Sequence, residues 1–529
     1  MNQVSVVAVG PEPITVDQVV AVARHGARVE LTAAALGALQ EGADLIAGLG
    51  SDPAAHYGVS TGFGALATRE IAAGDRAALQ ANVVRSHAAS TGAEVDREVV
   101  RAMMLLRLST LATGRTGVRP ATAVAYAGLL NAHITPVIGE YGSLGCSGDL
   151  APLAHCALAL MGEGQVRDAR GHLIDAAQAL AAANLLPVRL TEKEGLALIN
   201  GTDGMLGMLI LGLQDLAGLW DTADVAAALS VEATAGHAGP FQTHLQVLRP
   251  YPGQTESARN MVLTLRGSGI IDHLQAEAAA RVQDAYSLRC APQVTGAARE
   301  VQRFANGIAA IELVSIIDNP VITHLGTLES NGNFHGAPVA YALDMLAIPA
   351  ADVASMSERR TDRLLDVARN HGLPAFLAAD PGLHSGLMIA QYTAAGAVSE
   401  LKRLAVPASV DSIPSSAKQE DHVSMGWAAG LKLRRAIDAL GRVLAIEIMA
   451  ATRAIELRAP LKPGAAARRV LKLLRPTVPG PGLDRYLAPE IDAVYALVRD
   501  GAVARAALSG PISGATGPDP AGNEAGPSL

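Results

Sequence analysis

The chain has 529 residues and a formal net charge of −8, and it is half hydrophobic but only 3% aromatic; this favours several domains or one large assembly of close-packed Ala-, Leu- and Val-rich helices. The negative charge and the lack of a basic stripe argue against a nucleic-acid partner. Three cysteines without metal-type spacing, no signal-peptide pattern and apolar runs broken by polar residues predict no metal site, no disulfide framework, no membrane contact and a cytoplasmic location.

The first 200 residues are expected to form an N-terminal domain. A short strand is predicted at residues 4–9, and helical periodicity begins near Thr15 and again near Leu31, where Thr32 is a candidate cap for a run to about Leu49. Further helices are expected at residues 97–113, 120–132 and 150–162. Most of this region therefore looks like helical scaffold.

Two polar features interrupt this scaffold. The loop 56–64 places Tyr57 among three glycines, a pattern typical either of a flexible surface loop or of a mobile lid that carries a proton-transfer group. His87 lies in a helical context, where a single histidine is usually structural.

Residues 141–152, Tyr-Gly-Ser-Leu-Gly-Cys-Ser-Gly-Asp-Leu-Ala-Pro, are the most unusual stretch of the chain. Glycines at positions 142, 145 and 148 permit positive φ angles and close backbone approach. Asp149 is expected to cap the apolar helix that follows, so that the loop lies at the positive end of the helix dipole. No lysine follows the glycines and the pattern is not G-x-S-x-G, which excludes a phosphate loop and a nucleophile elbow.

The residues alone leave two interpretations of this loop. It is either an ordinary Gly-rich turn before a helix, or a turn in which the amide nitrogen of Gly148 attacks the carbonyl of Cys146. Loss of two waters, one of them from Ser147, would then leave a methylidene-imidazolone, an electrophile that no ordinary side chain provides. Because only the carbonyl of residue 146 takes part, a cysteine is acceptable there.

Residues 201–509 are predicted to form a bundle of long helices, and residues 510–529 a disordered tail rich in Gly and Pro. The segment 194–204 is interpreted as a Gly-punctuated turn that contains Asn200. A helix then extends to about Gly236, and later helices are expected at residues 337–369, 386–405 and 426–457. The polar segment 416–424 is interpreted as the capped start of the last helix.

Gln283, Tyr286 and Arg289 follow one another at intervals of three residues. If the segment is helical, the three side chains share one face of the helix. Such a polar face is either the wall of a site or simply a solvated surface, and the pattern does not choose between them.

Seven separated segments from about Tyr57 to about Arg458 occur in a single order: Y-G-V-S-T-G-F-G, S-H-A, G-S-L-G-C-S-G-D-L-A-P-L, E-G-L-A-L-I-N-G-T, Q-D-A-Y-S-L-R-C-A-P-Q-V, N-G-N-F-H and S-S-A-K-Q-E-D-H-V-S-M-G. Together they resemble the aromatic amino acid ammonia-lyase family, and within it the histidine branch. One such loop would be a weak signal, whereas the complete set is very specific.

The resemblance implies a mainly α-helical fold of the fumarase and aspartase type, assembled as a homotetramer whose active sites are shared between chains. It also implies elimination of ammonia from L-histidine to give trans-urocanate. In this family the electrophile is a methylidene-imidazolone, here formed from Cys146, Ser147 and Gly148 with no external cofactor. Many members have Ala where Cys146 stands.

The resemblance also implies roles for individual residues. Tyr57 is the expected base for the β-proton, and Arg289 is expected to bind the substrate carboxylate by a bidentate pair. The prosthetic ring is expected to be surrounded by Asn200, Gln283 and Tyr286.

His87 and Glu420 are assigned to the imidazole end of the substrate, with Phe334 packing nearby. A carboxylate pairs with an imidazole N–H, whereas a phenyl ring would leave Glu420 buried without a partner at a cost of about 1–3 kcal/mol. Lys418, where Asn is usual, and Asp203, where Gln is often found, are departures that are expected to tune affinity.

Three questions stay open at this stage. The sequence does not choose between attack on the electrophile by the substrate amine and attack by the imidazole ring. An aminomutase of the same family would share all of these residues and add ammonia back at the β-carbon. A non-catalytic helical scaffold would keep the fold without the ring.

Overall fold

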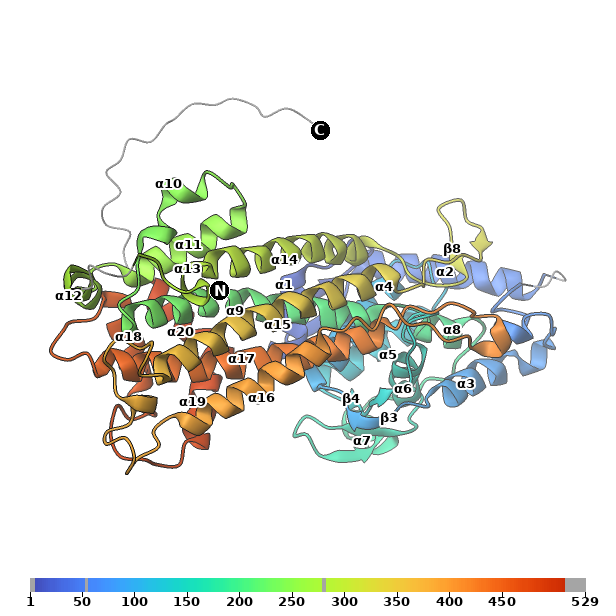
Figure 1. Ribbon diagram of the computed structural model, residues 1–529. Coiled ribbons are helices and arrows are strands. Elements are labelled where there is room, and N and C mark those ends of the chain that lie inside the picture. The colour runs from blue at the N-terminus through green and yellow to red at the C-terminus, as the bar shows by residue number, and fades with distance from the viewer. Residues whose placement is uncertain (1–4, 53–55, 278–281, 510–529) are drawn as a thin grey trace.

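Long helices lying side by side form the body of the molecule, with a smaller region of shorter helices at one end (Figure 1). The computed structural model describes residues 5–52, 56–277 and 282–509. The longest helices are α9 (Asp203–Ala233), α14 (Ala291–Val314), α15 (Ala337–Leu365) and α17 (Gly426–Glu456), and each packs against the others or a shared neighbour. The prediction of a mainly α-helical bundle is confirmed.

Shorter helices surround these four. They are α1 (Val16–His25), α2 (Ala33–Gly50), α3 (Arg76–His87), α4 (Arg97–Ala112), α5 (Pro120–Asn131), α6 (Leu150–Leu160), α7 (Ala176–Ala182), α8 (Glu194–Ile199), α10 (Thr243–Gln246), α11 (Pro252–Leu265), α12 (Gly269–Glu277), α13 (Tyr286–Arg289), α16 (Met388–Leu404), α18 (Ala465–Leu474), α19 (Ala488–Arg499) and α20 (Ala502–Leu508).

The strands are short and belong to small separate sheets. β1 (Val6–Val9) pairs in parallel with β2 (Arg28–Leu31), and the antiparallel pairs are β3 (Thr91–Glu94) with β5 (Gly139–Tyr141), β6 (Gln165–Arg167) with both β4 (Thr135–Pro136) and β7 (Leu173–Asp175), and β8 (Val321–Ile322) with β9 (Leu328–Glu329). None of them forms a layer comparable to the bundle in the part of the chain that the structure describes.

The hydrophobic core is formed by helices that are apolar on almost every side. Every residue of α9 from Asp203 to Leu213 is buried. α15 is long and apolar enough to cross a membrane by length and composition alone, but 61% of its apolar window is buried inside the bundle. These helices therefore serve as the centre of a folded core.

Several predicted helix boundaries are confirmed. The Thr32 side chain accepts a hydrogen bond from the backbone N–H of Ala35 at 3.1 Å and caps α2 as expected. α4, α5 and α6 fall within the ranges expected for them, as do α15, α16 and α17. The proposed division of the chain near residue 200 stays a prediction, and the predicted tail from 510 to 529 lies outside the described residues.

The interpretation of residues 194–204 as a turn is wrong in its first half. Residues 194–199 form the short helix α8, in which every side chain is buried. Glu194 anchors it, because its carboxylate accepts hydrogen bonds from the Arg119 guanidinium at 2.7 Å and from the Thr122 hydroxyl at 2.7 Å. Tertiary contacts outweigh the local turn signal here.

Candidate active site

The loop before α6 has the backbone that its glycines predict. Gly142, Gly145 and Gly148 have φ angles of 146°, 67° and 76°. A Cβ atom on Gly148 would lie 2.1 Å from the carbonyl oxygen of Gly201. Only glycine fits at position 148, for both its conformation and its space.

Asp149 caps a different helix from the one predicted. It makes no side-chain hydrogen bond to α6. Its Oδ2 accepts from the backbone N–H groups of Gly204 and Met205, both at 2.9 Å, and its Oδ1 from the Ser143 hydroxyl at 2.9 Å. Burial raises the pKa of Asp149 to about 7, although these donors oppose the rise. The loop is thereby fixed to the positive end of α9.

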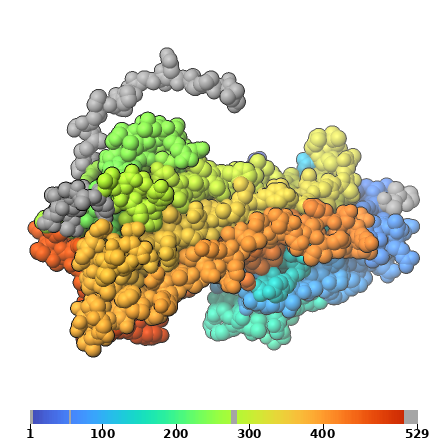
Figure 2. All heavy atoms as spheres, viewed as in Figure 1, coloured from blue at the N-terminus to red at the C-terminus, as the bar shows by residue number. Residues whose placement is uncertain are grey.

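Two segments from the second half of the chain hold the same loop. The carbonyl oxygen of Gly145 accepts hydrogen bonds from Gly336 N at 3.1 Å and from the Ser424 hydroxyl at 2.8 Å. The carbonyl of Leu144 accepts from Met425 N at 2.8 Å. Figure 2 shows the orange surface near residue 420 lying along the blue N-terminal region.

Glu420 reaches the side chains of the predicted Cys-Ser-Gly triad. Ser147 Oγ donates to Glu420 Oε1 at 3.2 Å, and Cys146 Sγ donates to Glu420 Oε2 at 3.2 Å. A third donor, Ser415 Oγ, lies 3.0 Å from Oε2. Burial, and then the negative charge of Glu420, raises the pKa of the Cys146 thiol to about 12.

The segment that carries Glu420 is a strained loop. α17 starts at Gly426, as predicted, but no side chain caps it, so the interpretation of residues 416–424 as a helix cap is wrong. Ser416, Ala417 and Lys418 have φ angles of 49°, 52° and 69°, which is the left-handed region. Backbone hydrogen bonds between Ser415 and Glu420 close this turn. Side chains with a Cβ pay roughly 1–2 kcal/mol each for such a conformation, and this kind of strain is common at functional sites.

His87 is the last residue of α3 and is half-buried beside this cluster. Burial lowers its pKa, while a hydrogen bond to the backbone of Val83 and the charge of Glu420 act in the opposite direction. The electrostatic influence of Glu420 places the two side chains in the same neighbourhood. His87 therefore lies within electrostatic reach of Glu420, and its role toward a substrate stays a prediction.

Tyr57 lies in the neighbouring loop. Its hydroxyl accepts a hydrogen bond from Gly64 N at 3.1 Å, and its ring meets Phe63 edge-on with 6.4 Å between centroids. A Cβ atom on Gly64 would lie 3.0 Å from Ser416 Oγ. The Tyr57 loop therefore contacts the strained loop that carries Glu420.

Asn200 is buried next to the triad, since Gly201 bridges to Gly148. Its Nδ2 donates to the carbonyl of Asn319 at 3.0 Å, and its Oδ1 has no hydrogen-bond partner within the described residues. Arg107 donates to the Asn200 carbonyl at 2.6 Å and lies 3.4 Å from Asp203. Asp203 and the backbone of Asn200 thus share the Arg107 guanidinium.

Phe334 lies in the turn before α15 and is half-buried. The next residue, His335, stacks on His422 with ring centroids 5.6 Å apart and an interplanar angle of 3°. No role is predicted from the sequence for this histidine pair or for Ser415. No local sequence pattern marks these contacts, because they join residues brought together only by the fold.

Gln283, Tyr286 and Arg289 do not share a helical face. Only residues 286–289 are helical, as α13, and Gln283 precedes it in irregular backbone. Tyr286 is 69% exposed, and the Arg289 guanidinium lies 4.5 Å from the centre of its ring. Arg289 Nε has no hydrogen-bond partner among the residues that the structure describes.

One chain places these three residues far from the triad. Arg360 donates to the carbonyl of Ser287 at 3.1 Å and pairs with Glu447, which also accepts from Ser230 near the end of α9. Asp149, in contrast, bonds to the first turn of α9. At 1.5 Å per residue, the two attachment points are about 40 Å apart.

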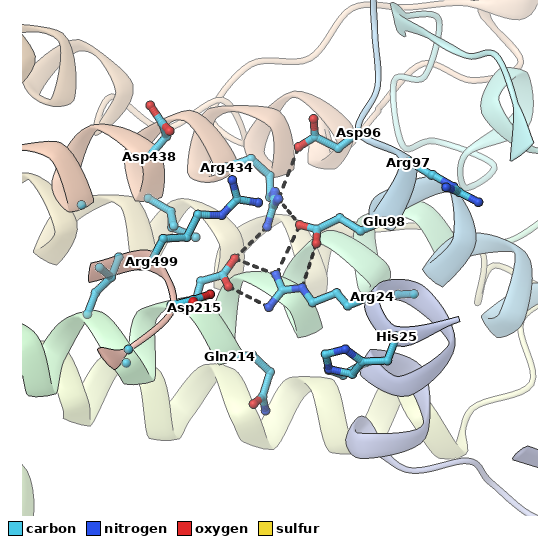
Figure 3. Close-up of a pocket in the computed structure, with 18 of the residues that line it drawn as sticks. Arg24, His25, Asp96, Arg97, Glu98, Gln214, Asp215, Arg434, Asp438 and Arg499 are labelled. Carbon is cyan, nitrogen blue, oxygen red and sulfur yellow. Dashed lines mark hydrogen bonds and ion pairs between the residues drawn. The ribbon is translucent and has the colours of Figure 1, made fainter. Parts of the chain in front are cut away.

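A cavity of about 1280 Å³ on the flank of the bundle contains none of the predicted site residues. Its wall is a ring of ion pairs in which Arg24 and Arg434 alternate with Glu98 and Asp215 (Figure 3). Arg101 beside it donates to carbonyls in the last turns of α1 and α5. The four charges of this ring pair with one another, which indicates a structural junction of α1, α4, α9 and α17.

The triad, its carboxylate and the glycine backbone form one arrangement in space, and comparison with known proteins gives the family of the chain that carries it. The family of aromatic amino acid lyases matches residues 14–476. The chain belongs to the aromatic amino acid lyase family. Histidine ammonia-lyases of Streptomyces griseus and Streptomyces avermitilis are 59% and 58% identical to it, over 96% of this chain and 99% of each relative.

Solved structures of the aromatic amino acid lyase fold agree with this assignment. Histidine ammonia-lyase from Trypanosoma cruzi is 36% identical, with a TM-score of 0.87 over 95% of both chains. Tyrosine aminomutase from Streptomyces globisporus is 37% identical, with a TM-score of 0.89 over 94% of this chain and 98% of that one.

Proposed function

We propose that this protein is an ammonia-lyase that converts L-histidine into trans-urocanate and ammonium. The observation that carries the proposal is the Glu420 carboxylate, which reaches Cys146 and Ser147 and has His87 in its neighbourhood. A carboxylate suits an imidazole N–H, whereas a phenyl or phenol ring would leave it without a partner. The relatives that are 58–59% identical, named histidine ammonia-lyase, support the same substrate.

The triad is proposed to form the methylidene-imidazolone. Gly148 N attacks the carbonyl carbon of Cys146, and two waters leave: one carries the carbonyl oxygen of Cys146, the other the hydroxyl of Ser147 together with its α-hydrogen. The positive φ of Gly148, the lack of room for a Cβ there and the bonds that hold Gly145 all fit this cyclisation. The group would supply the electrophile needed to release ammonia, because the β-proton of histidine is not acidic.

The remaining residues bind the substrate and move its β-proton. Tyr57 is proposed to take the proton, and Arg289 to bind the carboxylate as a bidentate pair. Asn200, Gln283 and Tyr286 complete the wall. Since the two points on α9 to which the triad and the Tyr286 segment are linked lie about 40 Å apart, we infer that Tyr286 and Arg289 reach a triad only in a second copy.

A homotetramer with shared sites is therefore part of the proposal. Exposed apolar side chains on α15 and α16 support such contacts between copies; they are Tyr341, Met345, Ile348, Ile389 and Tyr392. A cytoplasmic location is proposed along with it, on the ground of three free cysteines among the residues described.

The proposal is tested by intact mass followed by a substrate panel. We expect a deficit of two waters from the mass of the unmodified chain, and release of urocanate and ammonium from L-histidine but little product from tyrosine or phenylalanine. A chain at full mass would overturn the ring and the lyase together. A β-amino acid product with little ammonium would replace the lyase with an aminomutase.

A further inference from the structure

Three side chains donate hydrogen bonds to the Glu420 carboxylate, two of them to Oε2 and one to Oε1. Oε2 accepts from Cys146 Sγ at 3.2 Å and from Ser415 Oγ at 3.0 Å. Oε1 accepts from Ser147 Oγ alone among the described side chains, at 3.2 Å. The side chains of Cys146 and Ser415 are unchanged by the proposed ring formation, so both continue to hold Oε2.

The proposed cyclisation changes only one side of this arrangement. The hydroxyl of Ser147 leaves as water, so Oε1 loses its donor, while Oε2 keeps both of its own. A half-buried carboxylate oxygen without a donor is costly, and it is an acceptor ready for the next N–H group to arrive. In the proposed reaction that group is the imidazole N–H of the substrate.

We propose that Cys146 and Ser415 are positioning residues whose side chains hold Glu420 Oε2, so that Oε1 is directed at the imidazole of the substrate. This inference rests on the proposed function and deepens it. It gives the Cys146 thiol a task in substrate recognition, although the ring chemistry uses only the carbonyl of that residue.

Both donors are fixed by their surroundings. Ser415 is tied to Glu420 by backbone hydrogen bonds in both directions, Ser415 N to Glu420 O at 2.8 Å and Glu420 N to Ser415 O at 3.3 Å. Cys146 is only 8% exposed and packs with Val423 and Met425. Its raised pKa keeps the thiol protonated, and therefore a donor, at any pH near neutrality.

A thiol is a weaker donor than a hydroxyl, which sets the size of the effect. Cys146→Ala keeps the carbonyl needed for the ring and removes one donor from Oε2. We expect its KM for L-histidine to rise about two- to tenfold with little change in kcat, as the loss of one net hydrogen bond predicts. Ser415→Ala is expected to behave in the same way.

The conservative variant separates positioning from packing. Cys146→Ser restores a donor of similar size, and its KM should return to within about twofold of the wild-type value. Cys156→Ala is the matched control, because it removes a fully buried thiol from α6 without touching Glu420. Intact mass of every variant should keep the deficit of two waters, which shows that ring formation is unaffected.

Binding without turnover gives a second readout. Ser147→Ala has no hydroxyl and forms no ring, so its Glu420 Oε1 is free, and L-histidine binding to this variant is measured by calorimetry. Adding Cys146→Ala should weaken binding about two- to tenfold, and adding Cys146→Ser should not. The inference would be overturned if KM were unchanged in Cys146→Ala and in Ser415→Ala, and if adding Cys146→Ala to Ser147→Ala left the affinity unchanged. Urocanate release by the wild type would be intact in that case. Absence of urocanate from the wild type would overturn the proposed function, and this inference with it.

Discussion

The candidate site residues near the two ends of α9 differ in hydrogen bonding and in exposure. At the end that begins at Asp203, the side chains of Cys146 and Ser147 already bond to Glu420. At the other end Tyr286 is 69% exposed, and Arg289 Nε has no partner in the described chain. The first end is assembled, because its candidate groups already bond to one another, whereas at the second end the Tyr286 ring faces solvent and Arg289 is half-buried. In the proposed function, a single chain holds two unlike halves of a site, and association of copies would join them.

Mixing two inactive variants tests whether the two ends act together only across chains, and it has the largest expected effect. Ser147→Ala should remove the electrophile and Arg289→Gln the carboxylate contact, each lowering activity by orders of magnitude. Co-expression in equal amounts should restore roughly a quarter of wild-type activity, because each shared site draws a working triad and a working arginine independently.

The control for this experiment is a chain that carries both substitutions, co-expressed with Ser147→Ala. No site in that mixture has a working triad, so activity should stay at background. Equal activity in the two mixtures would mean that each chain completes its own site, and the interpretation of two halves would fail.

Glu420→Gln tests the assembled end directly. The substitution keeps the shape but removes the charge that pairs with the imidazole, so kcat/KM for L-histidine should fall about a hundredfold to a thousandfold. Glu30→Gln, at an exposed carboxylate on β2, is the control and should stay within about twofold. Unchanged kinetics in Glu420→Gln would remove this residue from the substrate site.

The thiol at the assembled end should be slow to react. Burial raises the pKa of Cys146 to about 12, so the thiolate fraction keeps rising with pH up to that value and is very small at pH 8. Alkylation at pH 8 should be at least about a hundredfold slower than for an ordinary free thiol. Iodoacetamide labelling and peptide mapping of Ser147→Ala at pH 8 and 10 measure this, with the unfolded chain as the reference. Rapid labelling at pH 8 would contradict the pKa direction.

The smallest expected effect concerns the strained loop. Lys418 has a φ of 69°, a conformation that Asn adopts more readily. Lys418→Asn should therefore raise the free energy of unfolding by about 0.5–1 kcal/mol. Gln419→Asn is the matched control, because Gln419 has a φ of −65° and gains nothing from the change. Thermal unfolding compares the two, and an equal or lower midpoint for Lys418→Asn would show that the strain is relieved elsewhere.

Local chemistry made much of the fold predictable. Thr32 and the long apolar periodicities set the helices, and the glycines at 142, 145 and 148 set the backbone of the loop. The hydrogen-bond partner of each polar side chain could not be predicted from the sequence. Asp149 was predicted to cap the nearest helix in the chain, but it caps α9, which begins more than fifty residues later. Periodicity describes one element at a time, whereas a cap across elements depends on how they pack.

The membership of the candidate site stays a prediction, whereas the layout of its residues in one chain could not be predicted from the sequence. Spacing suggested a common face for Gln283, Tyr286 and Arg289, and irregular backbone before Tyr286 removes it. The contacts of Ser415 and of the Cys146 thiol with Glu420 carry no sequence signal. Such contacts are properties of the assembled loops.

The bonds on Gly145 and Asp149 also set an order in time. The loop at 142–149 takes its final shape from Gly201, Met205, Gly336 and Ser424, so a nascent chain must be made to beyond residue 424 before the turn is complete. If cyclisation needs that turn, a ribosome-bound fragment keeps its unmodified mass, and so does a misfolded chain. The missing waters would then record, in a covalent and permanent form, that an individual molecule had once folded correctly.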